Sequence, residues 1–539
     1  MTEAFYGRVQ EHARRNPEGA ALSYRLPGGG YRVEAWAGLA GRARRLARYF
    51  ADAGGDAAVV PMLVGKAPDA VAAMLGAQGA GRAFAALNPK FRLPQLVAAL
   101  QATGSPVAVV DGPGLRVLAA GTDEPLVRST RWLVVDPDAS PLAKADGERL
   151  RGAGVALEDA AELPDVTDGW APPAGADPAR PGCCLFTSGS TGTPKGVLVS
   201  LGDLLGRAEA EREWFGLTAE DVLLNVLPFS FDVGLSQLLS ALYLGCELVV
   251  SPSWLPRDLM EAARERGATG MCGVPSIWQD LLRTGAAAPP PPSLRYVTVS
   301  GGSLAPAQLA ALAAALPGVG IYKTYGQTEA FRCASLRPEE LAARPGSVGR
   351  AYPGVRLLVV DEEGRPCAPG ETGEVVHAGL GTMLDYLGGG GEGKLGTHPA
   401  VPGLPVVYTG DLGWLDADGY LYLAGRRDGM VKVSGNRVFP AEVANHAAAL
   451  PGVAEAQAVA LPGAGDAALA CFVVLHPGAE PDPAGLRRAL AQRLPSYMVP
   501  RDVVVLDEMP RTPSGKPDLQ ELARRAAAPE PLPLAGAQT

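Results

Sequence analysis

Hydroxyl groups, glycines and one lysine are concentrated in the segment from residue 185 to residue 196, which reads LFTSGSTGTPKG. Its glycines permit a sharply bent backbone that presents N–H groups, its Ser and Thr side chains add hydrogen-bond donors, and Lys195 adds a positive charge. This set of groups suits a polyphosphate. A solvated Ser/Gly linker would lack the apolar residues that precede and follow the segment. We therefore predict a phosphate-binding loop between two strands.

The segment is not the P-loop of the common nucleoside triphosphatases. That motif needs a glycine directly before its lysine, and Pro194 stands there. A second run, GGGGEGKL at residues 388–395, nearly spells the P-loop but ends in leucine where serine or threonine is required. It lies in a stretch rich in Gly and Pro, and we interpret it as a flexible loop.

Polar residues also follow three apolar runs further along the chain. PFSFDVG spans residues 228–234, SGGS spans residues 300–303, and TYGQTE spans residues 324–329. Taken alone, the first two are ordinary features, because an acid after a strand often caps a helix and Gly-Gly-Ser is a common turn. The third is more specific, since an aromatic ring, a hydroxyl and a carboxylate together can stack on adenine, contact phosphate and hold Mg²⁺.

Two later motifs, YTGD at residues 408–411 and GRRDGMVK at residues 425–432, supply an aspartate and then an arginine. The Asp411 carboxylate can accept hydrogen bonds from both hydroxyls of a ribose, and Arg426 can reinforce the same sugar or a phosphate. The alternative is that the acids of these motifs belong to ordinary turns and that the arginine is a surface residue.

The elements that must position these motifs alternate along the middle of the chain. Apolar residues recur at helical spacing in several segments, and short apolar runs of strand length separate them. This alternation predicts a mainly parallel sheet covered by helices, with ligands at the carboxyl ends of its strands. The predicted helices cover residues 203–215, 235–244, 256–267, 275–283 and 304–316, and the predicted strands cover residues 247–250, 269–272, 296–299 and 320–324.

The pattern of the sequence changes twice after this region. Short strands and turns between residues 348 and 423 predict a β-rich subdomain, and a compact α/β pattern follows Asp428. We predict an α/β fold with a large N-terminal domain (1–427) of helix-covered sheets plus the β-rich subdomain. A small mobile α+β C-terminal domain (428–525) and a disordered Pro-rich tail (526–539) complete the prediction.

The composition fits a globular enzyme and argues against several other classes. Hydrophobic residues make up 47% of the 539 residues and charged residues 19%. The formal net charge of -9 does not provide the positive surface that nucleic acid or an anionic membrane requires, so neither partner is expected. The 7 Cys and 5 His residues are scattered, which indicates neither a disulfide framework nor a zinc site. No signal-peptide pattern opens the sequence, and a cytoplasmic location is expected.

Together these motifs resemble those of the adenylate-forming superfamily, which includes acyl-CoA synthetases, adenylation domains of peptide synthetases, and luciferases. The loop at residues 187–196 resembles the signature of that superfamily, and the other motifs follow in its order, ending with RTPSGK at residues 511–516. The resemblance covers nearly the whole chain, from residue 5 to residue 525.

The resemblance implies a role for each matching residue. Thr328 and Glu329 would contact the phosphates, and Glu329 would also bind Mg²⁺. Lys516 would be the catalytic lysine. Asp428 would be the hinge about which the small domain rotates. In the ATP site, Thr187, Ser188, Gly189, Ser190, Thr191 and Lys195 would line the pyrophosphate loop, Gly301, Gly302, Ser303 and Tyr325 would hold adenine, and Asp411 and Arg426 would bind ribose.

The implied reaction is attack of a substrate carboxylate on the α-phosphate of ATP, which releases pyrophosphate and leaves an acyl-adenylate. Charge spreads over the phosphoryl oxygens during the transfer, so positioning and positive electrostatics supply most of the catalysis. After rotation of the small domain, Lys516 would leave and residues 432–437 would face an incoming thiol, that of CoA or of a carrier-protein phosphopantetheine. A free-standing carrier protein is one partner that this chemistry would use.

The chain departs from the family pattern near the acyl pocket. Where acyl-CoA synthetases often carry a histidine it has Phe231, and Phe231-Asp232 resembles peptide-synthetase domains in which the aspartate holds the substrate α-amino group. In contrast, YGQTE and the GNRVFPAE motif at residues 435–442 look more like acyl-CoA ligases. Lys323 replaces the asparagine that often lies near the adenine amino group, which puts that adenine contact in doubt.

By the same correspondence, ten residues would line the acyl pocket, and the small size of several of them predicts a roomy pocket. Arg332 would pair either with an acidic group of the substrate or with Asp232, and the sequence leaves these two alternatives open. The predicted lining is Phe231, Asp232, Val233, Ser236, Gly273, Val299, Gly301, Thr324, Arg332 and Cys333.

The leading prediction is an AMP-forming ligase that transfers an acyl or aminoacyl group from a small carboxylic or amino acid to a thiol. An amine acceptor, which would give an amide, belongs to the same enzyme class. A non-catalytic nucleotide-binding homologue is the rival from another class, but Lys516, Glu329 and Asp411 are all present. An ATP hydrolase is disfavoured by the missing P-loop. The sequence does not identify the acid, the acceptor or the oligomeric state.

Overall fold

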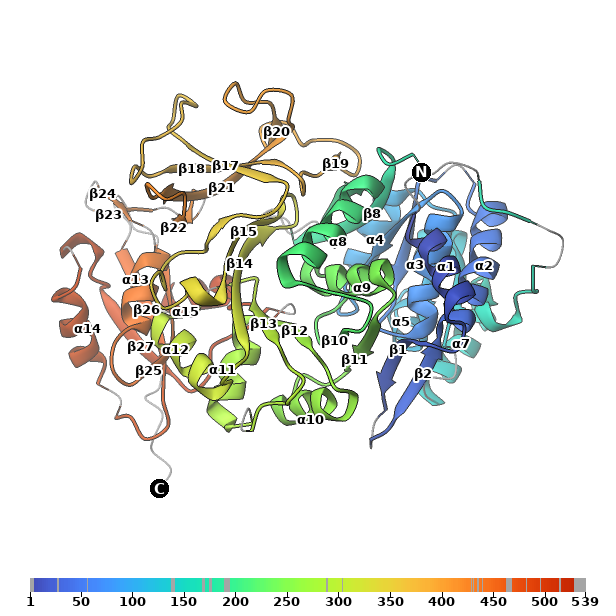
Figure 1. The fold of residues 1–539 in the computed structure, drawn as a ribbon, viewed down its shortest axis with the longest axis horizontal. Coiled ribbons are helices and arrows are strands. Elements are labelled where there is room, and N and C mark those ends of the chain that lie inside the picture. The colour runs from blue at the N-terminus through green and yellow to red at the C-terminus, as the bar shows by residue number, and fades with distance from the viewer. Residues whose placement is uncertain are drawn as a thin grey trace.

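Figure 1 shows the computed structural model of the chain. Its sheets fall into three regions: an N-terminal part with two large sheets, a β-rich region, and a C-terminal part. It describes residues 4–26, 29–55, 57–136, 141–166, 170–173, 177–188, 194–286, 289–302, 304–427, 429, 431–433, 436–438, 440–461, 468–480, 482–494, 496–512 and 515–527. Among these residues, no helix is both long enough and apolar enough to cross a membrane.

A nine-stranded sheet forms the centre of the molecule. Its inner strands from β14 to β1 pair in parallel, and three outer strands, β2, β15 and β16, pair antiparallel. The prediction of a mainly parallel sheet is confirmed. In spatial order the strands are β16 (Arg350–Ala351), β15 (Phe331–Leu336), β14 (Gly320–Gln327), β13 (Tyr296–Val299), β12 (Gly270–Gly273), β10 (Val222–Asn225), β11 (Glu247–Val250), β1 (Ala20–Arg25) and β2 (Tyr31–Ala35).

The helices between these strands agree closely with the predicted ranges. The clearest difference is that α9 begins at Asp232, three residues before its predicted start at residue 235. The first of these helices, α8, begins after Ser200, whose hydroxyl accepts the Asp203 N–H at 3.0 Å, and it ends at the left-handed Gly216. The helices are α8 (Leu201–Phe215), α9 (Asp232–Leu244), α10 (Pro256–Arg266), α11 (Pro275–Thr284) and α12 (Pro306–Ala315).

An eight-stranded sheet forms the second layer of the N-terminal part. Its order is β19 (Asp385–Tyr386), β9 (Pro194–Ser200), β8 (Pro181–Ser188), β4 (Ala83–Ala86), β3 (Val59–Leu63), β5 (Val107–Asp111), β6 (Arg131–Val135) and β7 (Leu157–Asp159). The helices that accompany it are α1 (Phe5–Arg15), α2 (Trp36–Ala53), α3 (Pro68–Gly79), α4 (Leu93–Thr103), α5 (Gly112–Ala119), α6 (Pro125–Ser129) and α7 (Pro141–Gly152).

Small residues let two of these helices pack closely. A Cβ at Gly76 of α3 would lie 2.7 Å from the Leu46 side chain of α2, so glycine is required for the observed approach. The resulting core joins side chains of both large sheets, including Val60 and Leu223, which are buried. The two layers are therefore fixed relative to one another by one continuous apolar cluster.

The β-rich region lies beside the two large sheets, at the top of Figure 1. The predicted β-rich subdomain is confirmed, and its strands pair antiparallel. The order is β17 (Val355–Val360), β18 (Gly373–Gly379), β21 (Val406–Leu415) and β20 (Leu395–Gly396), with β22 (Leu421–Arg426) also paired to β21.

The C-terminal part has two sheets of its own, β23–β24 and β25–β26–β27, and its own apolar clusters, separate from those of the large sheets. The last helix reaches Ala527, so the first two residues of the predicted tail are helical, and residues 528–539 lie outside the described part. The elements are β23 (Val431–Val433), β24 (Asn436–Val438), α13 (Pro440–Ala448), β25 (Val453–Leu461), β26 (Ala468–Leu475), α14 (Pro483–Ala491), β27 (Asp502–Leu506) and α15 (Leu519–Ala527).

Candidate functional site

One cleft of about 530 Å³ collects most of the residues that the sequence singled out. They come from segments that are more than three hundred residues apart, and both large sheets, the β-rich region and the C-terminal part contribute. The predicted residues that line it are Thr187, Lys195, Phe231, Asp232, Val233, Gly301, Thr324, Tyr325, Thr328, Glu329, Arg332, Asp411, Arg426 and Lys516.

The two flanks of the predicted phosphate loop face this cleft. The strands β8 and β9 form an antiparallel hairpin in which Thr187 is paired with Lys195, so the prediction of a strand on each side is confirmed. The Lys195 ammonium lies 5.3 Å from the centroid of the Tyr386 ring. Of the loop itself, Gly189, Ser190 and Thr191 lie outside the described residues, and so does the side chain of Ser188.

The end of β14 and the turn that leads to β15 supply the TYGQTE residues. The register of this hairpin shifts between Tyr325 and Gly326, where a Cβ on the glycine would lie 1.6 Å from the Phe331 carbonyl oxygen. Such a bulge re-aims the side chains beside it. As a result Thr324 and Tyr325 at the end of the strand and Thr328 in the turn all line the cleft.

A cluster of polar side chains joins the nine-stranded sheet to the β-rich region. The Tyr325 hydroxyl donates a hydrogen bond of 2.5 Å to the Asp411 carboxylate, and burial beside this carboxylate raises the Tyr325 pKa. Asp411 and Arg426 are paired directly across β21 and β22, with Oδ1 and Nη1 3.5 Å apart. The Asp–Arg pair that the sequence suggested is therefore brought together by strand register.

Glu329 is held in the cleft by an aromatic hydroxyl. The Tyr386 OH donates to its Oε1 at 2.8 Å, which links the turn after β14 to the edge strand β19 of the other sheet. A carboxylate presented in this way suits Mg²⁺, which commonly binds one or two carboxylates and the phosphates of its substrate. Such a site needs no cluster of protein ligands, and the described residues contain no group of three or more His, Cys, Asp or Glu that could hold a metal.

Lys516 reaches the cleft from the C-terminal part. Its Nζ lies 5.9 Å from the centroid of the Phe231 ring. The Arg511 guanidinium, which pairs with Glu455 at 2.7 Å, also donates to the Gly515 carbonyl at 3.2 Å and so steadies the segment that carries the lysine. Burial raises the pKa of the Asp232 carboxyl, and the nearby charge of Lys516 opposes that effect.

Five predicted residues are not placed at the cleft wall. Gly302 follows the lining residue Gly301 but is itself exposed, and Ser236 lines a separate small cavity. A Cβ at Gly273 would lie 2.6 Å from the Trp278 ring, so this glycine lies against a core tryptophan. Val299 and Cys333 have no exposed surface, since both lie in the core of the sheet.

The predicted adenine residue Ser303 and the predicted hinge Asp428 lie outside the described residues.

The ion-pair partner of Arg332 is Glu211 of α8, and among the described residues the arginine makes no ion pair with Asp232. The Arg332 guanidinium and the Glu211 carboxylate are 2.7 Å apart, with side chains 3% and 4% exposed. Arg332 also donates to the Tyr352 hydroxyl at 3.2 Å, and Ser240 donates to Glu211 at 2.6 Å. Although burial opposes its charge, Glu211 holds the Arg332 pKa above its ordinary value. Of the two alternatives that the sequence left open, the ion pair with Asp232 is therefore not the one formed, because α8 supplies Glu211 as the partner.

The lysine that replaces the usual asparagine does not line the cleft either. Lys323 is 4% exposed, and its ammonium donates to the Pro345 carbonyl at 3.2 Å. Burial lowers the Lys323 pKa to about 8. The side chain is therefore not part of the lining of the cleft.

Sequence reasoning missed the lining residues Phe331, Tyr386 and Lys394, and it gave no role to Ser300 and Gln327, although both lie in motifs that it singled out. Lys394 belongs to the glycine-rich run that was interpreted as a loop, and its ammonium donates to the Thr409 carbonyl at 3.3 Å. Its nearness to the YTGD motif depends on the pairing of β20 with β21, which no local pattern announces. Tyr386 likewise reaches Glu329 only through the tertiary fold.

Comparison with known proteins places this geometry in a family. The family model described as AMP-binding enzyme matches residues 9–387, and the one described as AMP-binding enzyme C-terminal domain matches residues 442–516. The chain is 37% identical over 371 residues to an L-proline–[L-prolyl-carrier protein] ligase of Streptomyces coelicolor. The aligned residues cover 66% of this chain and 68% of that protein.

Two further proteins show how broad the likeness is. A 2-succinylbenzoate–CoA ligase of Geobacillus kaustophilus is 31% identical over 419 residues, which cover 77% of this chain and 79% of that protein. The solved structure of the amide bond synthetase McbA from Marinactinospora thermotolerans matches with a TM-score of 0.80 at 25% identity, and the match covers 97% of this chain and 100% of that one.

Proposed function

The chain belongs to the AMP-binding enzyme family, the adenylate-forming superfamily, and from this premise we propose that it is an ATP-dependent, AMP-forming carboxylate–thiol ligase. The observation that carries the proposal is the cleft in which Lys195, Glu329, Asp411, Arg426 and Lys516 converge from distant parts of the sequence. A protein that had only kept the fold would have no reason to keep this combination of charges in one cavity.

In the proposed first step, the substrate carboxylate attacks the α-phosphate of ATP, and the bond to pyrophosphate breaks. Asp411 and Arg426 would hold the ribose, and Tyr325 would pack against adenine while its hydroxyl orients Asp411. Lys195 and Lys516 would stabilise the negative charge that spreads over the phosphoryl oxygens. Thr328 and Glu329 would hold Mg²⁺ and phosphate, and the metal, when bound, would neutralise charge on the leaving pyrophosphate.

In the proposed second step, a thiol attacks the acyl-adenylate and AMP leaves. The acceptors named for two of the relatives, a carrier protein and CoA, support a thiol. A second candidate is an amine acceptor, favoured by the full-length match to an amide bond synthetase. We also propose that residues 1–427 and 428–525 are separate domains that rotate about Asp428 between the two steps, and that the protein acts in the cytoplasm.

The test of the first step is ATP–pyrophosphate exchange with Mg²⁺, without thiol, across amino, aryl, fatty and dicarboxylic acids. We expect exchange that depends on one class of acid. Release of ADP and phosphate, or ATP binding without exchange for any acid, would contradict the proposal. With the acid known, product masses after incubation with CoA, a phosphopantetheinylated carrier protein or an amine would identify the acceptor.

Asp232 provides a test of whether the acid is an amino acid. Its carboxylate lines the cleft at the first turn of α9, where it can pair with an ammonium group. If the substrate carries an α-amino group, Asp232→Ala should lower kcat/KM for the amino acid roughly 10- to 100-fold, the loss of a charged hydrogen bond. The deaminated analogue, measured by the same exchange assay, is the control. An equal loss for both acids would show that Asp232 does not bind the amino group.

A further inference from the structure

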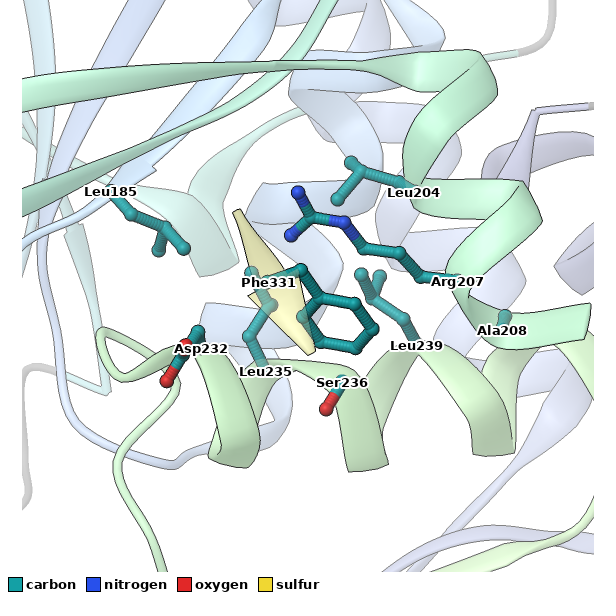
Figure 2. Close-up of a pocket in the computed structure, with 9 residues that line it drawn as sticks. All are labelled: Leu185, Leu204, Arg207, Ala208, Asp232, Leu235, Ser236, Leu239 and Phe331. Carbon is teal, nitrogen blue, oxygen red and sulfur yellow. The ribbon is translucent and has the colours of Figure 1, made fainter. Parts of the chain in front are cut away.

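A small cavity lies between α8 and α9, next to the cleft. Figure 2 shows its walls, with Leu204, Arg207 and Ala208 on α8 and four residues of α9 on the other side. The cavity has a volume of about 10 Å³, at the lower limit of what one water molecule needs. Three of the nine lining residues, Arg207, Asp232 and Ser236, are polar. The others are apolar, namely Leu185, Leu204, Ala208, Leu235, Leu239 and Phe331.

Phe331 separates this cavity from the cleft. Phe331 lines both spaces, as does Asp232. The ring is 4% exposed and lies between the two helices in Figure 2. Ser236, which the sequence assigned to the acyl pocket, lies on the cavity side of the ring. The ring therefore divides a set of residues that would otherwise line one continuous pocket.

The position of the ring is fixed from two directions. The Arg207 guanidinium lies 4.4 Å from the ring centroid, and Arg207 is itself held by Asp203 at 2.6 Å and by the Gly381 carbonyl at 3.0 Å. The Phe331 backbone has a φ of 46°, in the left-handed region that a bulky residue rarely adopts. Such a conformation persists only where its surroundings determine it, and it is common at ligand sites.

From this arrangement we infer that Phe331 is a specificity-determining residue that limits the length of the acid. The inference rests on the proposed function, because it concerns the end of the cleft where Asp232, Val233 and Thr324 would surround the acid. The tail of an acid whose carboxylate faces the phosphates would point at Phe331, and the ring stops it. Without the ring, the leucine walls of the cavity would accept a longer apolar tail.

The direct test is Phe331→Gly, because glycine accepts the left-handed φ at this position. ATP–pyrophosphate exchange is measured with straight-chain carboxylic acids and straight-chain 2-amino acids of increasing length. We expect the variant to accept tails longer than the wild type does. The ratio of kcat/KM for the long acid to that for the short acid should rise roughly 10- to 100-fold, as expected for added methylenes in an apolar pocket.

Two matched variants distinguish removal of the partition from a general loosening. Leu239→Ala enlarges the cavity from its far wall and leaves Phe331 in place, so the length limit should not change. Ala208→Leu in the Phe331→Gly background refills the cavity and should restore the limit. If Phe331→Gly fails to fold, as circular dichroism would show, Phe331→Leu opens the same partition in part and should give a smaller shift in the same direction.

The two proposals fail in different ways. If the wild type shows exchange but Phe331→Gly keeps its length limit, the inference about Phe331 is overturned and the proposed ligase function stands. If no acid supports exchange, the ligase proposal fails, and calorimetric binding of a long acid to both proteins still tests the partition. Equal affinity in the two proteins would overturn it, and binding confined to the variant would support it.

Discussion

Replacing Lys516 with alanine is expected to lower acid-dependent ATP–pyrophosphate exchange roughly 10²- to 10³-fold, the usual cost of removing one group that stabilises developing charge. The lysine lines the cleft beside Phe231 but its side chain is exposed, so it contributes little to packing. The free energy of unfolding should therefore change by less than about 0.5 kcal/mol. Urea unfolding and exchange kinetics on the same preparation would measure both quantities.

The matched control is Lys394→Ala. Lys394 is another lysine of the same cleft, and its ammonium donates a hydrogen bond to the Thr409 carbonyl. We expect a much smaller loss in that variant. An equal loss in the two variants would mean that the cleft needs positive charge in general rather than Lys516 in particular. Unchanged exchange in Lys516→Ala would contradict the catalytic assignment altogether.

Replacing Glu211 with alanine is expected to lower the free energy of unfolding by about 3–5 kcal/mol, because it leaves a buried guanidinium without its counter-charge. Glu211 and Arg332 are each less than 5% exposed, and the structure shows no second carboxylate in an ion pair with the arginine among the described residues. Since a typical domain is stable by only about 5–15 kcal/mol, this single change should be visible as a large drop in Tm.

The control is the double variant Glu211→Leu with Arg332→Met, which removes both charges and keeps apolar volume. Replacing a buried pair in this way is often neutral or stabilising, so the double variant should unfold at a higher urea concentration than Glu211→Ala alone. If the single variant were as stable as the wild type, the guanidinium would have found solvent or another partner, and Arg332 would not be a fixed wall of the cleft.

The sequence predicted the central sheet well because its signals are local. Strands β11 and β13 were predicted with their observed bounds, and the five helices around them differ from their predicted ranges by a few residues at most. Each of these elements has its own pattern of apolar residues in the sequence, which predicts it without reference to the rest of the fold. The extension of β14 to Gln327 was not predicted, because it depends on pairing with β15 across a bulge.

The site residues that belong to sequence motifs were predicted, and those that reach the site only through the tertiary fold were missed. Asp411, Arg426 and Glu329 were singled out from their motifs and line the cleft. Glu211 was not, because it lies in an ordinary charged helix and its importance comes only from its distance to Arg332. Tyr386 was missed for the same reason, since its hydroxyl meets Glu329 through the pairing of β19 with β9.

The burial of Cys333 bears on side reactions of the chemistry proposed for the cleft. An acyl-adenylate is an electrophile that any accessible thiolate would attack, and this cysteine directly follows the lining residue Arg332. Its thiol has no exposed surface, its Sγ lies 3.7 Å from the Ala330 carbonyl, and burial raises its pKa. Because the thiolate is the nucleophile, a thiol kept protonated inside the protein would not compete for the acyl-adenylate of the proposed reaction. In the proposed reaction, the activated acyl group would thereby be preserved for an acceptor that arrives from outside.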